Sequence, residues 1–407
     1  MGIGVERRRA MRRVGRPPTA AICVLAGLLC CLLAVAACTT APPRVPYTQQ
    51  EQAEAIIPGI PGARLWADDP AIAAGRRSVV ARANLAQPSI LALSGGGPDG
   101  AFGAGLLGGW TARGTRPQFT FVTGASAGAL LAPFAFLGPS YDETIKGVFA
   151  SGEMANLLQT DAFSALFGAS LFKTAPLRDL IAHHVDPPLL EAIAREYRTG
   201  RRLYIVTTNI DAQRTAIWDM GKIADSGDPG ALELFRNVMA ASATIPGVFS
   251  PVLIDVEANG KHFAEMHVDA AVTNNVLVVP ESVLISGTPL FPPESRPKVY
   301  VIINGKLSPY FEVVRASTLT IVRRSFETSL RANTRNTLLA SLQFAKSKSW
   351  EFNIAAIDAD YPNSTGDVFD QTYMSQLFEY GYQRGRNGRL FQSTPTGFRA
   401  APRVAGR

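Results

Sequence analysis

From residue 89 onward, the sequence alternates between short apolar runs and longer stretches with apolar residues at helical spacing. The short runs, rich in β-branched residues and bounded by turn residues, are Ile90–Leu93, Phe119–Val122, Leu203–Thr207, Val252–Val256 and Val299–Ile303. Runs of this length predict strands buried on both faces of a parallel-type sheet. The helical stretches are Ala101–Trp110, Pro188–Tyr197 and Ala231–Ala241, with one or two covering helices within Phe311–Phe344. Strands that alternate with helices predict an α/β fold.

The regions that flank this pattern differ in composition. Residues 38–85 are rich in Pro, Ala, Gln and Glu, which predicts an N-terminal tether with one short helical stretch. Residues 391–407 are polar and contain Pro and Arg, as expected of a frayed tail. We therefore expect a leader at residues 1–37, the tether at 38–85, one folded domain at 86–390 that includes the covering helices, and the tail at 391–407.

The leader predicts export. Six arginines between Arg7 and Arg16 precede 18 uncharged residues, Ala20–Ala37, and small residues stand directly before Cys38. This segment resembles the signal peptide of a bacterial lipoprotein, which implies that Cys38 becomes the lipidated first residue of the mature chain. The protein would then be anchored in the bacterial envelope, facing the periplasm or the cell surface. An uncleaved membrane helix is the alternative, because 18 residues is near the length that spans a bilayer.

Composition and charge exclude several classes of protein. A hydrophobic content of 47% and a mean hydropathy of +0.09 exclude a wholly disordered chain. The net charge of +7 belongs mostly to the leader, where six arginines and one glutamate leave +2 for the remaining residues. A nucleic-acid surface needs its positive charge on the folded domain, so we expect no nucleic-acid partner. All four cysteines lie at or before Cys38, so the mature chain has no internal disulfide and no cysteine metal site.

A glycine-rich turn, Ser94–Gly100, lies between the first predicted strand and the helix that follows it. Such a turn exposes backbone N–H groups at the positive end of a helix, which suits an anion. Gly95, Gly97 and Gly100 formally match a dinucleotide-binding fingerprint, but the acidic residue expected after the second strand is missing. An oxyanion hole and a purely structural tight turn are the other two interpretations.

The sequence Gly124-Ala125-Ser126-Ala127-Gly128 follows the second predicted strand and precedes an apolar helical run, Ala129–Phe136. A strand–turn–helix context is what a G-x-S-x-G nucleophile elbow requires. The residues that flank the serine must be small, because the strand and the helix approach each other closely there. All four flanking residues are Gly or Ala, which predicts that Ser126 is a nucleophile.

A serine nucleophile needs a base, and the four histidines are poorly placed to supply one. An α/β-hydrolase has its histidine late in the chain, whereas no histidine follows His267. Asp269 lies in an apolar stretch and is followed by two small residues, Ala270 and Ala271. Partial burial would raise the pKa of this carboxylate and make it a better base. A capping or turn aspartate is the structural alternative.

Taken in chain order, these motifs resemble those of the patatin-like phospholipases: a G-G-G-x-x-G loop, a G-x-S-x-G elbow and a D-G-[GA] motif. The resemblance covers about Ser89 to Asn304. It implies a three-layer α/β/α sandwich with a mainly parallel sheet, and hydrolysis of acyl esters in membrane lipids. It further implies that Ser126 attacks the ester and Asp269 accepts its proton, while the N–H groups of Gly95, Gly96 and Gly97 bind the oxyanion. Neither a metal nor a cofactor is expected.

Two positions depart from the family pattern. Asp99 follows Pro98 where the family usually has a basic residue, and we expect it to face solvent or to cap the helix Ala101–Trp110. Ala270 replaces a glycine, which would cost about 1 kcal/mol if the backbone there needs a positive φ. These departures motivate an alternative function, a catalytically inactive lipoprotein that serves as a binding or scaffold module. The sequence does not indicate an oligomeric state.

Overall fold

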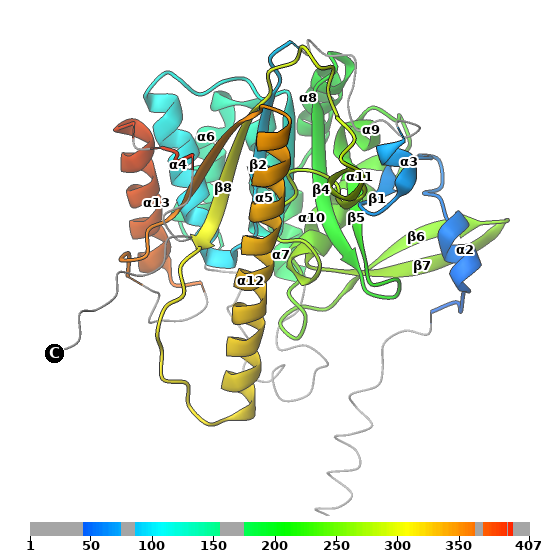
Figure 1. Ribbon diagram of the computed structural model, residues 1–407. Helices are drawn as coiled ribbons and strands as arrows, with labels where there is room; N and C mark the ends of the chain where they lie inside the picture. Colours follow the sequence, from blue (N-terminus) through cyan, green and yellow to red (C-terminus); the bar gives the residue numbers. More distant parts are fainter. Residues whose placement is uncertain (1–43, 75–85, 155–174, 363–368, 389, 394–407) are drawn as a thin grey trace, which may run out of the picture.

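The computed structural model describes residues 44–74, 86–154, 175–362, 369–388 and 390–393 (Figure 1). The predicted leader, the predicted lipidation site at Cys38 and most of the predicted tail lie outside these residues. Within the described ranges, no helix combines the length and the apolar character that crossing a membrane requires.

The centre of the fold is a mixed and mostly parallel sheet of nine strands. Seven strands form its main path, in the spatial order β1 (Arg64–Trp66), β5 (Arg214–Asp219), β4 (Arg202–Asn209), β3 (Phe121–Ala125), β2 (Ser89–Leu93), β8 (Lys298–Lys306) and β9 (Glu351–Ile357). The run from β4 to β9 is parallel throughout, and β1 and β5 are antiparallel to their neighbours. Two further strands, β6 (Val252–Ala258) and β7 (Lys261–Val268), form a hairpin that joins the sheet through β4.

Helices cover both faces of this sheet. One face carries α4 (Gly100–Ala112), α5 (Ala127–Leu137), α6 (Asp142–Ala150), α7 (Ala175–His184), α8 (Pro187–Arg198), α9 (Met220–Ala224), α10 (Ala231–Ser242) and α13 (Gln371–Arg386). The other face carries α3 (Pro70–Ala73), α11 (Glu281–Ser286) and α12 (Thr318–Ser347). The predicted three-layer α/β/α sandwich with a mainly parallel sheet is therefore confirmed.

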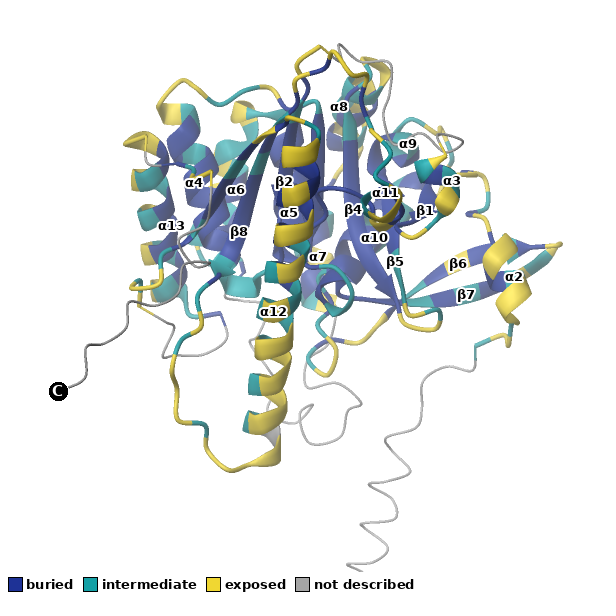
Figure 2. Ribbon diagram, in the orientation of Figure 1, coloured by how far each residue is buried: buried dark blue, intermediate teal, exposed yellow. Residues whose placement is uncertain are grey.

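The two helical layers belong to two hydrophobic cores because successive strand residues point to opposite faces. In β2, Leu91 and Leu93 pack into the core under α4 and α5, whereas Ile90 and Ala92 pack into the core under α12. The central strands are almost wholly buried (Figure 2), which explains why they read as continuous apolar runs in the sequence.

The predicted strand Val252–Val256 differs from the expectation of a parallel strand. It belongs to β6, which pairs antiparallel with β7 through a turn at Asn259 and Gly260. Burial alternates along β6, with Asp255 exposed, so only one face of the hairpin packs on the protein. The polar residues at alternate positions were the signal for this arrangement. The covering region within Phe311–Phe344 forms a single helix, α12, of 30 residues.

Much of the predicted tether is folded onto the domain. Helix α2 (Gln49–Glu54) begins with a capping box between Thr48 and Glu51, and β1 pairs with β5 at the edge of the sheet. The Arg64 side chain of β1 forms a buried ion pair with Glu265 of β7. Further upstream, the guanidinium of Arg44 donates two hydrogen bonds to Asp211, of 2.9 and 3.1 Å. A strand of three residues is too short to be recognised from the sequence, which explains the difference.

Candidate active site

The chain reverses direction sharply at Ser126, between the end of β3 and the start of α5. The backbone of Ser126 has φ 52° and ψ −123°, a region that residues with side chains rarely occupy. Such a conformation costs about 1–3 kcal/mol and persists only where the surroundings enforce it. This turn is the strand–turn–helix geometry that the G-x-S-x-G pattern predicts.

The glycines on either side of Ser126 allow this turn to form. A Cβ atom on Gly124 would lie 2.5 Å from the carbonyl oxygen of Gly128. A Cβ atom on Gly128 would lie 2.3 Å from the carbonyl oxygen of Leu93, at the end of β2. Both distances are shorter than atoms tolerate, so side chains at these positions would force α5 away from β2 and β3.

Ser242 holds the turn from the opposite side. Its hydroxyl accepts a hydrogen bond from the backbone N–H of Ser126 (2.9 Å) and donates one to the carbonyl of Val206 in β4 (2.6 Å). Ser242 is the last residue of α10 and is fully buried. It therefore fixes the strained backbone of Ser126 against the neighbouring strand.

The Ser126 hydroxyl donates a hydrogen bond to the Asp269 carboxylate, with 2.7 Å between Oγ and Oδ2. Asp269 follows the last residue of β7, and its second oxygen accepts a hydrogen bond from the N–H of Ala271 (2.8 Å). The backbone N–H of Asp269 donates to the carbonyl of Thr244 (3.0 Å). Two residues 143 positions apart in the sequence therefore meet in one hydrogen bond, with both carboxylate oxygens engaged.

The serine–aspartate pair lies in surroundings of low polarity. Ser126 is 5% exposed and Asp269 is 1% exposed. Within the described residues, no cationic side chain forms an ion pair with Asp269. Burial therefore raises the pKa of Asp269 to about 7, although the hydrogen bonds from Ala271 and Ser126 oppose this rise. A carboxylate with this pKa can both accept and return a proton near neutral pH.

Ala270 is accommodated without strain. Residues Ala270–Val272 form a single turn of 3₁₀ helix, and Ala270 is not among the described residues with a positive φ. A glycine-specific backbone is therefore not needed at this position. The free-energy cost considered for the alanine does not arise.

The glycine loop lies directly against Ser126. A Cβ atom on Gly95 would lie 2.8 Å from the Cβ of Ser126, so only glycine allows this contact. The N–H of Gly95 donates to the carbonyl of Asn275 (3.0 Å), which differs from its expected place in the oxyanion hole. Within the described part of the chain, the N–H groups of Gly96 and Gly97 have no hydrogen-bond partner. Gly97 has a φ of 55° and begins the turn that leads into α4.

Two asparagines that sequence reasoning missed fix the glycine loop. Asn304, near the end of β8, donates from its side chain to the carbonyl of Ser94 (2.7 Å) and accepts from the N–H of Gly103 (3.1 Å). Asn275 supplies the carbonyl that binds Gly95. A polar residue that ends an apolar strand, as Asn304 does, is the signal that could have identified the first of them.

Asp99 is half-buried and its side chain does not cap the following helix, so the expectation of a cap is wrong. Its carboxylate accepts a hydrogen bond from the hydroxyl of Tyr373 in α13 (2.7 Å), and no capping bond to α4 is present. Burial raises the pKa of Asp99 to about 6, while Tyr373 and the charges of Lys306 and Arg331 oppose the rise. The side chain is thus bound to α13, which accounts for an acidic residue in this loop.

The histidines are engaged elsewhere. The ring nitrogens of His267 lie 2.9 Å from the hydroxyl of Thr207 and 3.2 Å from the carboxylate of Glu265. His184 binds Glu153 (2.5 Å), and His262 is exposed on the β6–β7 hairpin. The partner of the Ser126 hydroxyl is therefore a carboxylate and not an imidazole.

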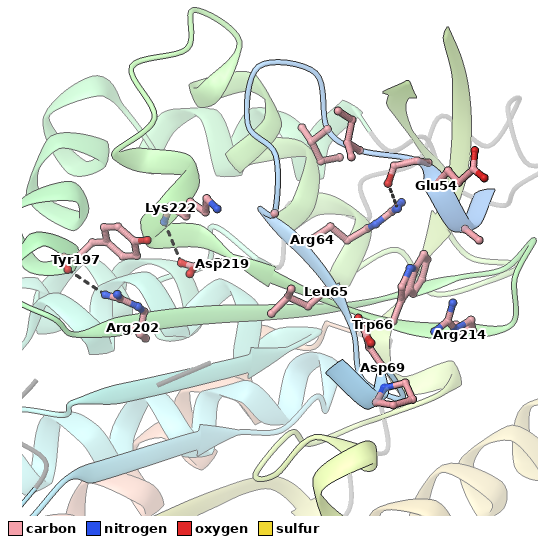
Figure 3. Close-up of a pocket in the computed structure, with 16 residues that line it drawn as sticks. Glu54, Arg64, Leu65, Trp66, Asp69, Tyr197, Arg202, Arg214, Asp219 and Lys222 are labelled. Carbon is pink, nitrogen blue, oxygen red and sulfur yellow. Dashed lines mark hydrogen bonds between the residues drawn. The ribbon is translucent and has the colours of Figure 1, made fainter. Parts of the chain in front are cut away.

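A separate pocket of about 700 Å³ lies beside β1 and β5, and none of the site residues described above lines it (Figure 3). Three of its four cationic side chains are already bound within the fold. Arg64 donates to the carbonyl of Ala55 (2.8 Å), Arg202 donates to that of Tyr197 (3.0 Å), and Arg214 pairs with Asp68 (2.5 Å). We therefore assign no function to this pocket.

Of the comparisons with known proteins, the one with protein families agrees with the motifs. Among solved structures, the crystal structure of VipD from Legionella pneumophila matches with a TM-score of 0.36 and 12% sequence identity, over 74% of this chain and 67% of that chain. No curated protein matches the sequence. The family model for patatin-like phospholipases matches residues 91–281, a range that contains the glycine loop, the serine turn and Asp269. Residues 91–281 of the chain therefore form a patatin-like phospholipase domain, of a family whose activity is lipid acyl hydrolysis.

Proposed function

We propose that this protein hydrolyses acyl esters of membrane lipids, with Ser126 as the nucleophile and Asp269 as the proton acceptor. The observation that carries this proposal is the 2.7 Å hydrogen bond between the two side chains, formed at a strained turn and almost shielded from solvent. The family supports lipid acyl hydrolysis in general, and the geometry supports these two residues.

In the first half-reaction, the oxygen of Ser126 attacks the ester carbonyl carbon while its proton passes to Asp269. The C–O bond to the alcohol then breaks, and Asp269 returns the proton to the leaving alkoxide. In the second half-reaction, water attacks the acyl-serine and gives a proton to Asp269. The fatty acid leaves as the Ser126 oxygen regains that proton. The raised pKa of Asp269 suits a group that must hold the proton only transiently.

The N–H groups of Gly96 and Gly97 would stabilise the oxyanion. They lie in the loop whose preceding residue, Gly95, contacts Ser126, and they have no hydrogen-bond partner in the described residues. Donors that are already oriented toward the developing charge need no reorganisation during the reaction. Each contributes about 3–4 kcal/mol to lowering the barrier.

The Ser126→Ala variant tests the proposal. We expect hydrolysis of p-nitrophenyl butyrate and of phospholipid vesicles to fall to background, and labelling by a fluorophosphonate probe to disappear. The Ser151→Ala variant is the matched control, because this serine is exposed at the end of α6. Retained turnover by folded Ser126→Ala would refute the assignment. A wild-type protein that the probe does not label would instead be an inactive member that binds or organises other molecules.

We also propose that Cys38 is lipidated and that the protein is anchored in the bacterial envelope. The support is the sequence alone, in which a basic segment, an uncharged stretch and small residues precede this cysteine. Metabolic labelling with an alkyne-bearing palmitate should mark the wild-type chain in the membrane fraction. The Cys38→Ala variant should remain unlabelled, and equal labelling of both chains would contradict the proposal.

A further inference from the structure

Within the described ranges, the N-terminal half of α12 is a surface that the rest of the domain leaves largely exposed. Further along the helix, Leu338 and Leu342 are buried in the core beneath it. The first half instead projects past the edge of the sheet at which β8 ends (Figure 1), and most of it is exposed (Figure 2). That edge is the one where the parallel strands end and where Ser126 lies.

Large apolar side chains are concentrated on this projecting half and on the loop before it. Phe311 is 91% exposed and Val313 is 81% exposed. Three more exposed apolar residues follow within the first three turns of the helix: Ile321, Val322 and Phe326. Scattered apolar residues on a surface are ordinary, whereas five within 16 residues of chain mark a contact surface.

The charge of the same segment is positive. Residues 307–326 hold three arginines and one glutamate, a net charge of +2, which equals that of the whole chain after residue 37. Glu312 lies 3.7 Å from Arg323 and 3.3 Å from Arg324, so it adds no unpaired negative charge to the surface. Exposed apolar side chains among arginines are typical of segments that lie in the interface of an anionic bilayer.

The surface is continuous with the candidate active site through the middle of α12. Asn333 donates a hydrogen bond to the carbonyl of Thr273 (3.1 Å), and Thr334 accepts one from the side chain of Asn275 (2.9 Å). Asn275 in turn binds the N–H of Gly95 in the glycine loop. A bilayer that contacts the projecting half of α12 would therefore face the edge of the sheet that carries Ser126.

We propose that residues 307–326 dock the domain onto a lipid bilayer that contains anionic headgroups. The apolar side chains insert among the acyl chains, and the arginines bind the headgroups. This inference rests on the proposed function, because a protein that hydrolyses membrane lipids must contact a bilayer. It adds the segment that brings the active site to that substrate.

Fluorescence quenching tests the docking without requiring activity. Tryptophan is introduced by Val313→Trp, and by Ile285→Trp as a control on α11, where Ile285 is 78% exposed. Both changes are made in the Ser126→Ala background, so that vesicles of phosphatidylethanolamine and phosphatidylglycerol stay intact. Lipids with brominated acyl chains should quench the added fluorescence at position 313 by about half and that at position 285 hardly at all. Equal quenching at both positions, or none at 313, would overturn the proposal.

Kinetics separate docking from chemistry. The Phe311→Ser/Val313→Ser variant should hydrolyse p-nitrophenyl butyrate within about twofold of wild type but phospholipid vesicles at least fivefold more slowly. Equal rates on vesicles would overturn the docking surface. A wild type that hydrolyses neither substrate would refute the proposed function, and the quenching experiment would still decide the docking. Light scattering could also show that wild type is a dimer and that the Phe311→Ser/Val313→Ser variant is a monomer. That result would make this surface a contact with a second copy of the chain and would overturn the proposal.

Discussion

Two buried carboxylates, four residues apart on and just after β7, have opposite environments. Glu265 is fully buried, pairs with the guanidinium of Arg64 and lies 3.2 Å from His267. Burial raises its pKa, but His267 and the charge of Arg64 outweigh burial and hold the pKa below its ordinary value. Asp269 has no such cation among the described residues, so burial prevails and raises its pKa to about 7.

The comparison separates a carboxylate held in an ion pair from one that is not. With its pKa below the ordinary value, the Glu265 carboxylate is ionised at neutral pH and joins β7 to β1 through Arg64. In the part of the chain that the structure describes, the Asp269 carboxylate is bound by the Ser126 hydroxyl and a backbone N–H. A buried group with a strongly shifted pKa is a candidate functional residue.

Asp269→Asn should give the largest effect. An amide of the same shape cannot accept the proton of Ser126, so kcat/KM on p-nitrophenyl butyrate should fall by about 10³-fold. The free energy of unfolding should stay constant or rise, because an unpaired buried carboxylate is removed. The matched control is Asp255→Asn on the exposed side of β6, which should leave both quantities unchanged. A kcat/KM within tenfold of wild type would exclude Asp269 as the base.

Glu265→Gln should have the opposite profile. It leaves the Arg64 guanidinium buried without a negative partner, which should lower the free energy of unfolding by about 3–5 kcal/mol in urea titrations. The kcat/KM of the molecules that remain folded should stay within about twofold of wild type. If kcat/KM fell while the free energy of unfolding stayed constant, Glu265 would be the carboxylate that hydrolysis requires, and the assignment to Asp269 would be wrong.

The pH dependence of stability follows from the direction in which the pKa of Asp269 is shifted. The folded pKa of about 7 lies above the unfolded value of about 4, so folding favours the protonated form. The contribution of Asp269 to stability is therefore greatest below about pH 4, falls as the pH rises to about 7 and is constant above it. Urea titrations at pH 5 and pH 8 should show the Asp269→Asn variant gaining stability relative to wild type as the pH rises.

The same titration governs the rate. Below about pH 7, kcat/KM of wild type should rise tenfold per pH unit as Asp269 loses its proton, and it should level above that value. The residual activity of Asp269→Asn should lack this transition. A transition in the variant at the same pH would assign the titration to another group.

Ser242→Ala should affect kcat/KM less than Asp269→Asn and stability less than Glu265→Gln. It leaves the N–H of Ser126 and the carbonyl of Val206 without their partner, which should cost about 1–3 kcal/mol of stability. Because the strained turn is then held less firmly, kcat/KM should fall by roughly tenfold. Unchanged kinetics, with Ser151→Ala as reference, would show that the turn does not need this support.

The sequence predicted the central fold and the two candidate catalytic side chains because each depends on local signals. Buried parallel strands such as β2 and β3 are continuous apolar runs, and a serine between small residues after a strand has few conformations available. The pairing of Ser126 with Asp269 came from the family resemblance, because nothing local shows which residues 143 positions apart will meet.

The supporting contacts were not predicted for a related reason. Ser242, Asn275 and Asn304 each form a hydrogen bond with a residue more than 100 positions away, which no local pattern predicts. The use of the Gly95 N–H by Asn275 likewise depends on how a later loop packs. Tyr373 binds Asp99 across 274 positions, so the hydrogen-bond partner of that carboxylate could not be predicted before the position of α13 was known.

If Cys38 is lipidated as proposed, the bond between Arg44 and Asp211 limits how far the domain can stand from the membrane. Only five residues lie between Cys38 and Arg44, and a fully extended chain over these six steps spans about 20 Å. A lipid on Cys38 would thus keep Arg44 within about that distance of its own leaflet. The lipids nearest to the domain would then be those of the membrane that holds the anchor.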